Sequence, residues 1–166
     1  MTTEWVEQQP AGAVDKNWYS AGINSDGTKF IAGISDGRLY TYNGSSWTEQ
    51  QPAGAVNGYW YGSAINSDGT KFIAGADYSR LYTYDGSSWT EQQPAGAVDK
   101  SWRGVGINSD GTKFIAAVYG GRLYTGSEPS AEGPANLKSY MGVLKANIAK
   151  INGVPIANIL KLNGVA

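Results

Sequence analysis

The sequence predicts an all-β protein, a β-propeller built from four-stranded blades, and two observations support this prediction. When the chain is compared with itself at an offset of 42 residues, all six tryptophans and all three phenylalanines fall into matching positions. A period of this length containing four short apolar segments is typical of one propeller blade. In addition, repeated Asp-Gly and Asn-Gly pairs between short runs rich in Tyr, Ile and Thr favour strands joined by tight turns. The matching aromatic residues are Trp5, Trp47 and Trp89, then Trp18, Trp60 and Trp102, and finally Phe30, Phe72 and Phe114.

The turns locate the strands within each copy of the repeat. Residues 10–17 are too rich in Pro, Gly and Ala to form a strand, so they are expected to form a loop. Residues 18–23 are expected to be the strand nearest the propeller axis, because Ser20, Ala21 and Gly22 are small enough for a crowded centre. The expected strands of the first copy are residues 5–9, 18–23, 29–34, 38–42 and 47–50, of which the last completes the first blade and begins the next copy.

Three copies of the repeat do not close a ring, because known propellers have about four blades or more. Residues 1–125 are therefore expected to form a three-blade segment that closes by oligomerisation. Residues 5–9 form an outer strand with no blade of their own, whereas the last copy, residues 102–125, lacks its fourth strand. We expect the N-terminal strand of one chain, including Trp5, to complete the last blade of another copy. A six-bladed homodimer is favoured, and a nine-bladed homotrimer is the alternative.

The copies differ mainly in the loop before the inner strand, at the start of that strand, and in the turn between the second and third strands. Strand direction places all these positions at one end of the ring, which is typical of a binding surface built on loops. Tyrosine, aspartate and asparagine there suit the stacking and hydrogen bonding of sugar rings, while drift in exposed loops is the alternative explanation. The candidate ligand-binding residues are Asp15, Lys16, Asn17, Tyr19, Asp36, Asn57, Tyr59, Tyr61, Asp77, Tyr78, Asp99, Lys100, Arg103 and Tyr119.

Two runs of the sequence, residues 83–89 and 114–125, resemble the Asp-box, or sialidase-like, propeller repeats of bacteria and phages. The resemblance implies that Asp85 closes the turn between the third and fourth strands, which is a folding role. The chain departs from the family pattern in two ways, because the turn is one residue shorter and Asn43 stands in the first copy where the second has Asp85.

The same resemblance does not imply sialidase activity for this chain. Sialidases need a cluster of three arginines, a tyrosine nucleophile and its glutamate partner. Here Arg38, Arg80 and Arg122 occupy one repeated position in separate copies, which predicts a structural role for them.

Composition excludes several classes of site. The chain has no histidine and no cysteine, so it has no disulfide, no thiolate or imidazole metal site and no histidine-based triad. We expect no catalytic residue, no metal and no cofactor. The net charge of −1 predicts no nucleic-acid partner, and no apolar run approaches the roughly 18 residues that span a bilayer. Because Glu4 and Glu7 stand where an export signal has basic and then apolar residues, we expect the chain to fold in a cytoplasm.

The end of the chain has a different character. Residues 126–134 are expected to be a linker, and residues 135–166 a tail with four lysines and no acidic residue. The apolar positions of the tail predict an amphipathic helix that anchors or oligomerises the protein, while its Asn-Gly pairs leave short hairpins open as the alternative. An 11-residue echo within the tail resembles segments of phage virion proteins. The residues of the expected helical seam are Leu137, Met141, Leu144, Ile148 and Ile151.

Together these features predict a non-enzymatic structural or adhesion protein of a phage virion, assembled in the host cytoplasm. Its propeller is expected to bind a surface glycan, and its tail to dock to other virion proteins. A free-standing lectin-like or scaffold propeller in the cytoplasm is the alternative. A glycosidase that uses paired carboxylates is a more distant one.

Overall fold

The computed structural model describes residues 2–129, 150–151 and 154–155, and in these residues it contains strands and no helix. The all-β prediction is therefore confirmed. No helix in the described part of the chain is long and apolar enough to cross a membrane. The chain divides into two units, Met1–Glu128 and Pro129–Ala166, and each is described here by itself.

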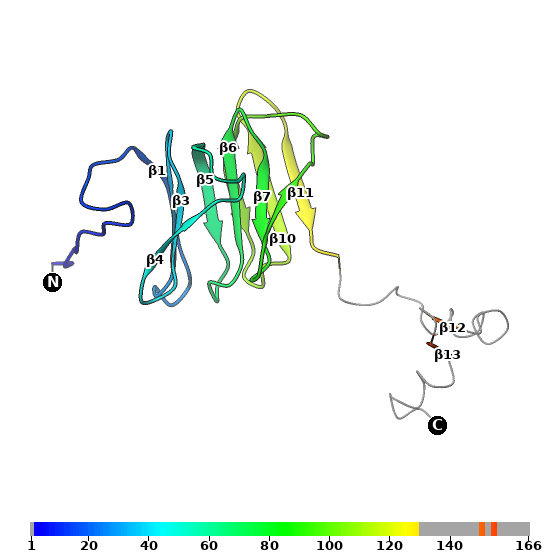
Figure 1. Ribbon diagram of the computed structural model, residues 1–166, viewed down its shortest axis with the longest axis horizontal. Helices are drawn as coiled ribbons and strands as arrows, with labels where there is room; N and C mark the ends of the chain where they lie inside the picture. Colours follow the sequence, from blue (N-terminus) through cyan, green and yellow to red (C-terminus); the bar gives the residue numbers. More distant parts are fainter. Residues whose placement is uncertain (1, 130–149, 152–153, 156–166) are drawn as a thin grey trace. The chain divides into compact units, whose positions relative to one another are not determined.

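The first unit consists of three antiparallel sheets that follow one another along the chain (Figure 1). The first and second sheets have four strands each, and the third has three, in the order β11-β10-β9. The strands of the first sheet are β1 (Trp18–Ile23), β2 (Phe30–Ile34), β3 (Leu39–Tyr42) and β4 (Trp47–Gln50). The second sheet contains β5 (Tyr59–Ile65), β6 (Phe72–Asp77), β7 (Leu81–Tyr84) and β8 (Trp89–Gln92), and the third contains β9 (Trp102–Ile107), β10 (Lys113–Val118) and β11 (Leu123–Ser127).

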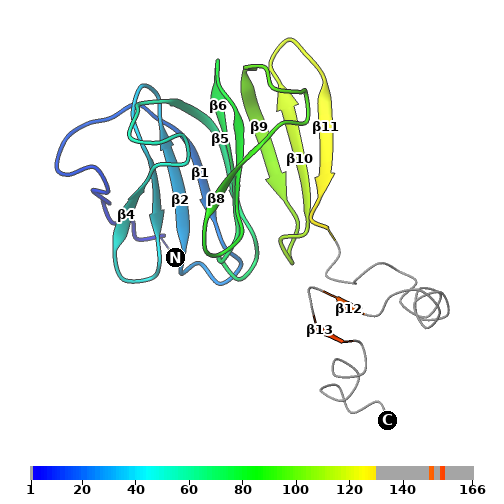
Figure 2. The ribbon, with the colours of Figure 1, turned by 45° about the vertical axis from the view of Figure 1, so that its right-hand side comes forward.

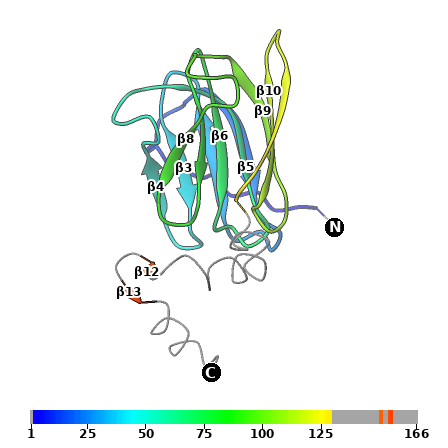
Figure 3. The same ribbon diagram turned by 90° about the vertical axis from the view of Figure 1, so that its right-hand side faces the viewer.

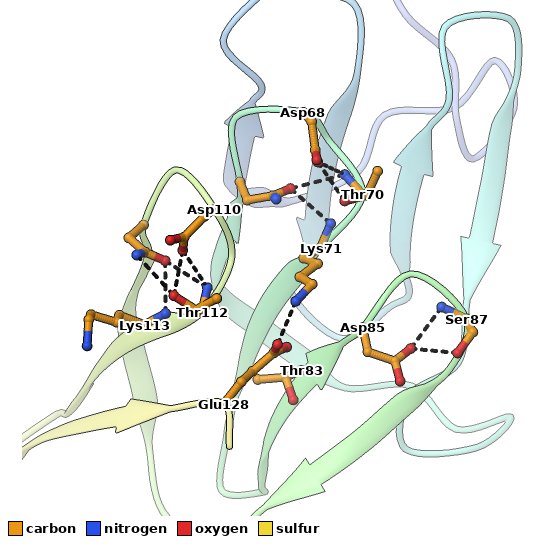
Figure 4. Close-up of polar contacts among 12 residues, drawn as sticks. Asp68, Thr70, Lys71, Thr83, Asp85, Ser87, Asp110, Thr112, Lys113 and Glu128 are labelled. Carbon is orange, nitrogen blue, oxygen red and sulfur yellow. Dashed lines mark hydrogen bonds and ion pairs between the residues drawn. The ribbon is translucent and has the colours of Figure 1, made fainter. Parts of the chain in front are cut away.

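The turn between the first two strands of each sheet is held by its own side chains. In the first copy, Asn24 Oδ1 accepts hydrogen bonds from the backbone N–H of Thr28 (3.0 Å) and of Lys29 (2.9 Å). Asp26 accepts a further bond from the Thr28 N–H at 2.9 Å, and Gly27 supplies the positive φ of 75° that the turn requires. The turns around Asp68 and Asp110 repeat this pattern (Figure 4).

The turn between the third and fourth strands is closed in the same manner. Asp85 accepts hydrogen bonds from the backbone N–H of Ser87 (2.8 Å) and of Ser88 (2.9 Å), as Figure 4 shows for Ser87. Asn43 accepts the corresponding bonds in the first sheet at 2.9 and 3.0 Å. An amide oxygen thus replaces a carboxylate oxygen without loss of the turn.

The core lies between neighbouring sheets, which stack face to face (Figure 2). Ile31 and Leu39 of the first sheet are buried together with Trp60 and Tyr82 of the second. Ile73 and Leu81 of the second sheet are buried in the same way with Trp102 and Ala116 of the third. Each sheet therefore presents an Ile–Leu face to the sheet that follows it and a tryptophan to the sheet that precedes it.

Glycine allows the backbones of adjacent sheets to approach closely. A Cβ atom on Gly33 would lie 2.6 Å from the carbonyl oxygen of Trp60, and one on Gly75 would lie 2.7 Å from that of Trp102. These distances are too short for any side chain, so the sheet spacing at both contacts depends on glycine.

The sequence locates the strands of all three sheets to within one or two residues at most boundaries, and the third sheet has no fourth strand. The expected strand at residues 5–9 is absent, because in a single chain this segment has no strand beside it to pair with. The three sheets form an open stack and not a closed ring (Figure 1). Figure 3 views this stack from the side of β10 and β11. Gly126 and Ser127, which were expected to begin the linker, belong to β11.

The second unit corrects the prediction for the tail at one point. Ile151 does not lie in a helix but in β12 (Lys150–Ile151), which pairs antiparallel with β13 (Val154–Pro155). Ile151 lies opposite Val154, and the Asn152-Gly153 pair comes between them in the sequence, so the hairpin alternative is correct here. The other expected seam residues, Leu137, Met141, Leu144 and Ile148, lie outside the described residues.

Candidate functional site

Loops and turns at one end of the sheets hold most of the candidate ligand-binding residues. The loop before each inner strand of the second and third sheets pairs with the turn between the second and third strands of the preceding sheet. Gly58 and Gly37 exchange backbone hydrogen bonds of 2.8 and 3.0 Å, and Lys100 and Ser79 exchange bonds of 2.9 and 3.2 Å. The loops are thereby fixed to the scaffold at the same end of the stack.

Two of the repeated arginines hold these loops in place. Arg38 donates to the carbonyl oxygens of Val56 (2.6 Å) and Ala55 (3.1 Å) and lies 3.5 Å from the carboxylate of Glu49. Arg80 lies 3.0 Å from Asp99 and 3.6 Å from Glu91. These contacts join a loop to the outer strand of one sheet, so both arginines have a structural role here.

The central feature of this end is a row of side chains from equivalent positions of the three sheets. Tyr19, Tyr61 and Arg103 are separated by 42 residues each in the sequence and lie near the starts of β1, β5 and β9. The rings of Tyr19 and Tyr61 are 4.6 Å apart, and the guanidinium carbon of Arg103 lies 5.0 Å from the Tyr61 ring centre and 4.3 Å from that of Tyr119. We call Tyr19, Tyr61, Arg103 and Tyr119 the tyrosine–arginine row. Tyr59 lies beside it, 6.2 Å from Tyr61.

Asp77 fixes the position of Arg103 from below the surface. Its carboxylate is buried and accepts a hydrogen bond of 2.6 Å from the Arg103 guanidinium. Burial raises the pKa of Asp77, but the hydrogen bonds and the charge of Arg103 outweigh this effect and leave the pKa below its usual value. Asp77 was predicted among the ligand-binding residues, and its buried carboxylate contacts Arg103 of the row.

Tyr78 follows Asp77 and has an unusual backbone conformation. Its φ is +52°, in the left-handed region that bulky residues rarely adopt, and its side chain is 77% exposed. Asp36 and Gly120 occupy the same repeat position with φ values of 55° and 66°. Because all three sheets have a positive φ at this position, the repeated turn requires the conformation whatever residue stands there, and Tyr78 adopts it as part of the turn.

The remaining candidates are more dispersed. Asp15, Lys16 and Asn17 line a shallow hollow with Ser35 and Asp36 at the first sheet. Asn57 is exposed, whereas Asp99 is engaged by Arg80, and Lys100 takes part in the loop pairing.

Sequence reasoning missed Ser35, whose hydroxyl lies 3.3 Å from the hydroxyl of Tyr61. Ser35 stands at the repeat position of Asp77, and each of the two contacts a member of the row in the next sheet. The signal that reveals Ser35 is therefore the shared repeat position with Asp77.

Searches against protein-family models and curated proteins found no match to this chain. Within the described residues, no group of three or more Asp, Glu, His or Cys side chains is placed to hold a metal ion. The arrangement is a surface of aromatic faces, hydroxyls and one paired guanidinium.

Proposed function

We propose that the protein is a non-enzymatic binding protein whose three sheets are blades of a β-propeller and whose tyrosine–arginine row binds a saccharide. The observation that supports this most is the continuity of the row. Tyr19, Tyr61 and Arg103 come from equivalent positions of successive sheets and contact one another in sequence at a single end. The scaffold that holds them is nearly the same in every copy.

The chemistry of the row favours a ligand that is rich in hydroxyl groups. The rings of Tyr19, Tyr59 and Tyr119 are exposed and offer faces on which the C–H groups of a sugar ring stack. Tyrosine hydroxyls and the free N–H groups of Arg103 supply hydrogen bonds to sugar hydroxyls. Because Asp77 neutralises Arg103, the row has no strong excess of positive charge and favours a neutral saccharide over a polyanion.

The carboxyl groups support binding over hydrolysis. A glycosidase that uses two carboxyl groups needs one with a raised pKa as general acid. Asp77 has a lowered pKa, and Asp99 is held by Arg80 at 3.0 Å. The Asp77 carboxyl group is thus held in its ionised form, which is unsuited to donating a proton.

The proposed propeller is completed by one further copy of the chain, with two further copies as the alternative. The resemblance to Asp-box repeats and the echo in the tail favour a phage virion as its setting, where the protein acts in adhesion and the tail attaches it. A free-standing lectin-like propeller is the second candidate, and the same surface serves either protein.

The test is binding of the full-length chain to an array of neutral and acidic glycans. The unmodified protein is expected to bind a subset of glycans, and Tyr19→Ala and Tyr119→Ala, both at exposed rings of the row, are expected to reduce that binding at least about tenfold each. Val56→Ala, at an exposed loop residue outside the row, is the matched control and is expected to bind normally. No binding by the unmodified protein, or equal binding by all variants, contradicts the proposal.

A further inference from the structure

Two repeat positions whose side chains are buried in the first and second sheets are exposed in the third sheet. Ile31 and Ile73 are fully buried, whereas Ile115 at the same repeat position of the third sheet is 42% exposed. Leu39 and Leu81 are 0% and 5% exposed, whereas Leu123 is 64% exposed. The third sheet therefore presents the same Ile–Leu face as the other two, but no fourth sheet covers it.

The first face of the stack has the complementary features. Trp60 and Trp102, which cover the Ile–Leu faces inside the stack, are each 2% exposed, but Trp18 is 40% exposed. The third sheet therefore exposes an Ile–Leu face and the first sheet exposes a tryptophan, which are the two surfaces that pack together twice within the chain. The two surfaces lie at opposite sides of the stack (Figure 1) and do not meet in one chain.

The N-terminal segment already lies where the outer strand of a preceding sheet belongs. Trp89 of β8 donates its indole N–H to Gln50 of β4 at 2.9 Å. Trp47 of β4 donates in the same manner to Gln8 at 3.2 Å, and Gln8 precedes Gln50 by 42 residues. Gln8 thus makes the contact that Gln50 makes from the outer strand β4. In a single chain, however, residues 5–8 have no described sheet to which they could be the outer strand.

The edge strand of the third sheet lacks the partner that the other two sheets have. β3 pairs with β4 and β7 pairs with β8 in the same register, with Tyr42 opposite Trp47 and Tyr84 opposite Trp89. β11 pairs with β10 alone among the described strands. Its outer row of N–H and C=O groups is therefore available for a further strand.

We propose that residues 5–8 of a second copy of this chain form the fourth strand of the third sheet, and that the first sheet of that copy covers Ile115 and Leu123. The repeat fixes the register, because residues 5–8 correspond to β4 and β8. Leu123 pairs with Gln8, Tyr124 with Glu7, Thr125 with Val6, and Gly126 with Trp5 of the second copy. Trp18 of that copy packs on Leu123 as Trp60 packs with Leu39.

The same correspondence supplies polar partners for residues at the end of the stack. Arg122 is exposed in one chain, whereas Arg38 and Arg80 at its repeat position contact Glu49 and Glu91 of the outer strand. At the junction Arg122 reaches Glu7 of the second copy. Within the chain, the Ser25 N–H donates to the Ser67 carbonyl and the Ser67 N–H to the Ser109 carbonyl, each at 3.1 Å. At the junction the Ser109 N–H donates in the same way to the Ser25 carbonyl of the second copy.

The junction also extends the tyrosine–arginine row. Tyr119 has the repeat position of Ser35 and Asp77, which contact Tyr61 and Arg103 of the next sheet. At the junction the next residue in this series is Tyr19 of the second copy, so the row continues from Tyr119 to that tyrosine. A saccharide that spans this point is bound by two chains. Closure by further copies is part of the proposed function, and this consequence also rests on its saccharide binding, whereas the register of the junction does not depend on saccharide binding.

One position makes the junction different from the contacts inside the chain. Ala117 stands where Gly33 and Gly75 allow the closest approach of the next sheet. A Cβ at those glycines would lie within 2.7 Å of a tryptophan carbonyl, so the second copy must sit slightly farther away at Ala117. The junction is thus the loosest contact of the assembly.

A pair of cysteines tests the register directly, because the natural chain has none. Val6 and Thr125 correspond to Thr48 and Thr41, which are directly opposite in β4 and β3. Opposed residues of an antiparallel pair have Cα atoms within the range that a disulfide spans. The full chain with Val6→Cys and Thr125→Cys is therefore expected to oxidise into covalent species of two or three chains on a non-reducing gel. The control with Thr41→Cys and Thr48→Cys is expected to form its disulfide within one chain.

The outcomes separate the junction from the binding proposal. Two or three linked chains, with mass equal to a whole multiple of the monomer, support the junction and count the copies in the ring. A disulfide within single chains, or free thiols while the control pair is oxidised, overturns it. If the linked species forms and binds no glycan on the array, the saccharide proposal fails and the junction stands.

Discussion

Leu39 and Trp60 are buried together between the first and second sheets, whereas Leu123 and Trp18, the residues at the same repeat positions at the ends of the stack, are 64% and 40% exposed. The contact between leucine and tryptophan is thus made twice within the chain. At the ends of the stack, Leu123 lacks the tryptophan and Trp18 lacks the leucine. In a chain of repeats, each unit buries its apolar face only against a neighbour. The proposed assembly therefore uses only the kind of contact that the sheets already make within the chain.

Leu123→Asp is expected to dissociate the assembly. The substitution removes a leucine from the junction and places a charge there, which weakens association by about 2 kcal/mol or more, or roughly 30-fold. Sedimentation velocity is expected to show a single-chain species with unchanged circular dichroism, because Leu123 is exposed within one chain. Val98→Asp makes the same kind of change at an exposed loop residue and is expected to leave the assembly intact. Equal behaviour of the two variants argues against the junction.

Ala117→Gly is expected to strengthen the assembly. The glycine restores the close approach that Gly33 and Gly75 allow inside the chain, and a gain of about 1 kcal/mol, or roughly fivefold in the dissociation constant, is reasonable. The reverse change, Gly75→Ala, is expected to lower the free energy of unfolding, because its Cβ would lie 2.7 Å from the Trp102 carbonyl. Dilution series followed by light scattering measure the first effect, and weaker association of Ala117→Gly disproves it.

Asp77→Asn is expected to weaken both the fold and the ligand surface. The neutral amide no longer balances the guanidinium of Arg103, which reduces the free energy of unfolding by about 1–2 kcal/mol and frees Arg103 to leave Tyr61 and Tyr119. Urea denaturation and glycan binding are the measurements. Asp36→Asn, at an exposed carboxylate, is the control and is expected to change stability little. Full glycan binding by Asp77→Asn means that Arg103 does not need this support.

Acid is expected to destabilise the unmodified chain more than Asp85→Asn. Hydrogen bonds from the Ser88 backbone, and from the hydroxyl and backbone of Ser87, lower the pKa of Asp85 to about 2. Because the folded pKa lies below the unfolded value, the ionised carboxylate stabilises the fold above about pH 4, and this stabilisation is lost as the pH falls toward 2. Asn43 closes the same turn without a titrating group. Denaturation curves between pH 5 and pH 2 that fall in parallel for both proteins contradict this role of Asp85.

The strands of each sheet could be predicted from the 42-residue repeat, because the turns between them are fixed by residues close to one another in the sequence. Asn24, Asp26 and Gly27 fix one turn through bonds within six residues of chain, and such patterns are readable from sequence. The pairing of Asp77 with Arg103 was not readable, since it joins two sheets across 26 residues. At Ile151 the apolar spacing predicted a helix, but Ile151 pairs with Val154 of a short antiparallel strand. The absence of a strand at residues 5–9 reflects a partner that a single chain does not contain.

The native mass of the unmodified full-length protein tests the central claim most directly. The claim is that the open faces of the stack, with Trp18 at one end and Leu123 at the other, close on further copies of the chain. Native mass spectrometry at micromolar concentration is expected to give one species of twice the 17.6 kDa chain mass, or of three times that mass if the ring has nine blades. A stable species of one chain, or a series of assemblies without an upper limit, contradicts the account.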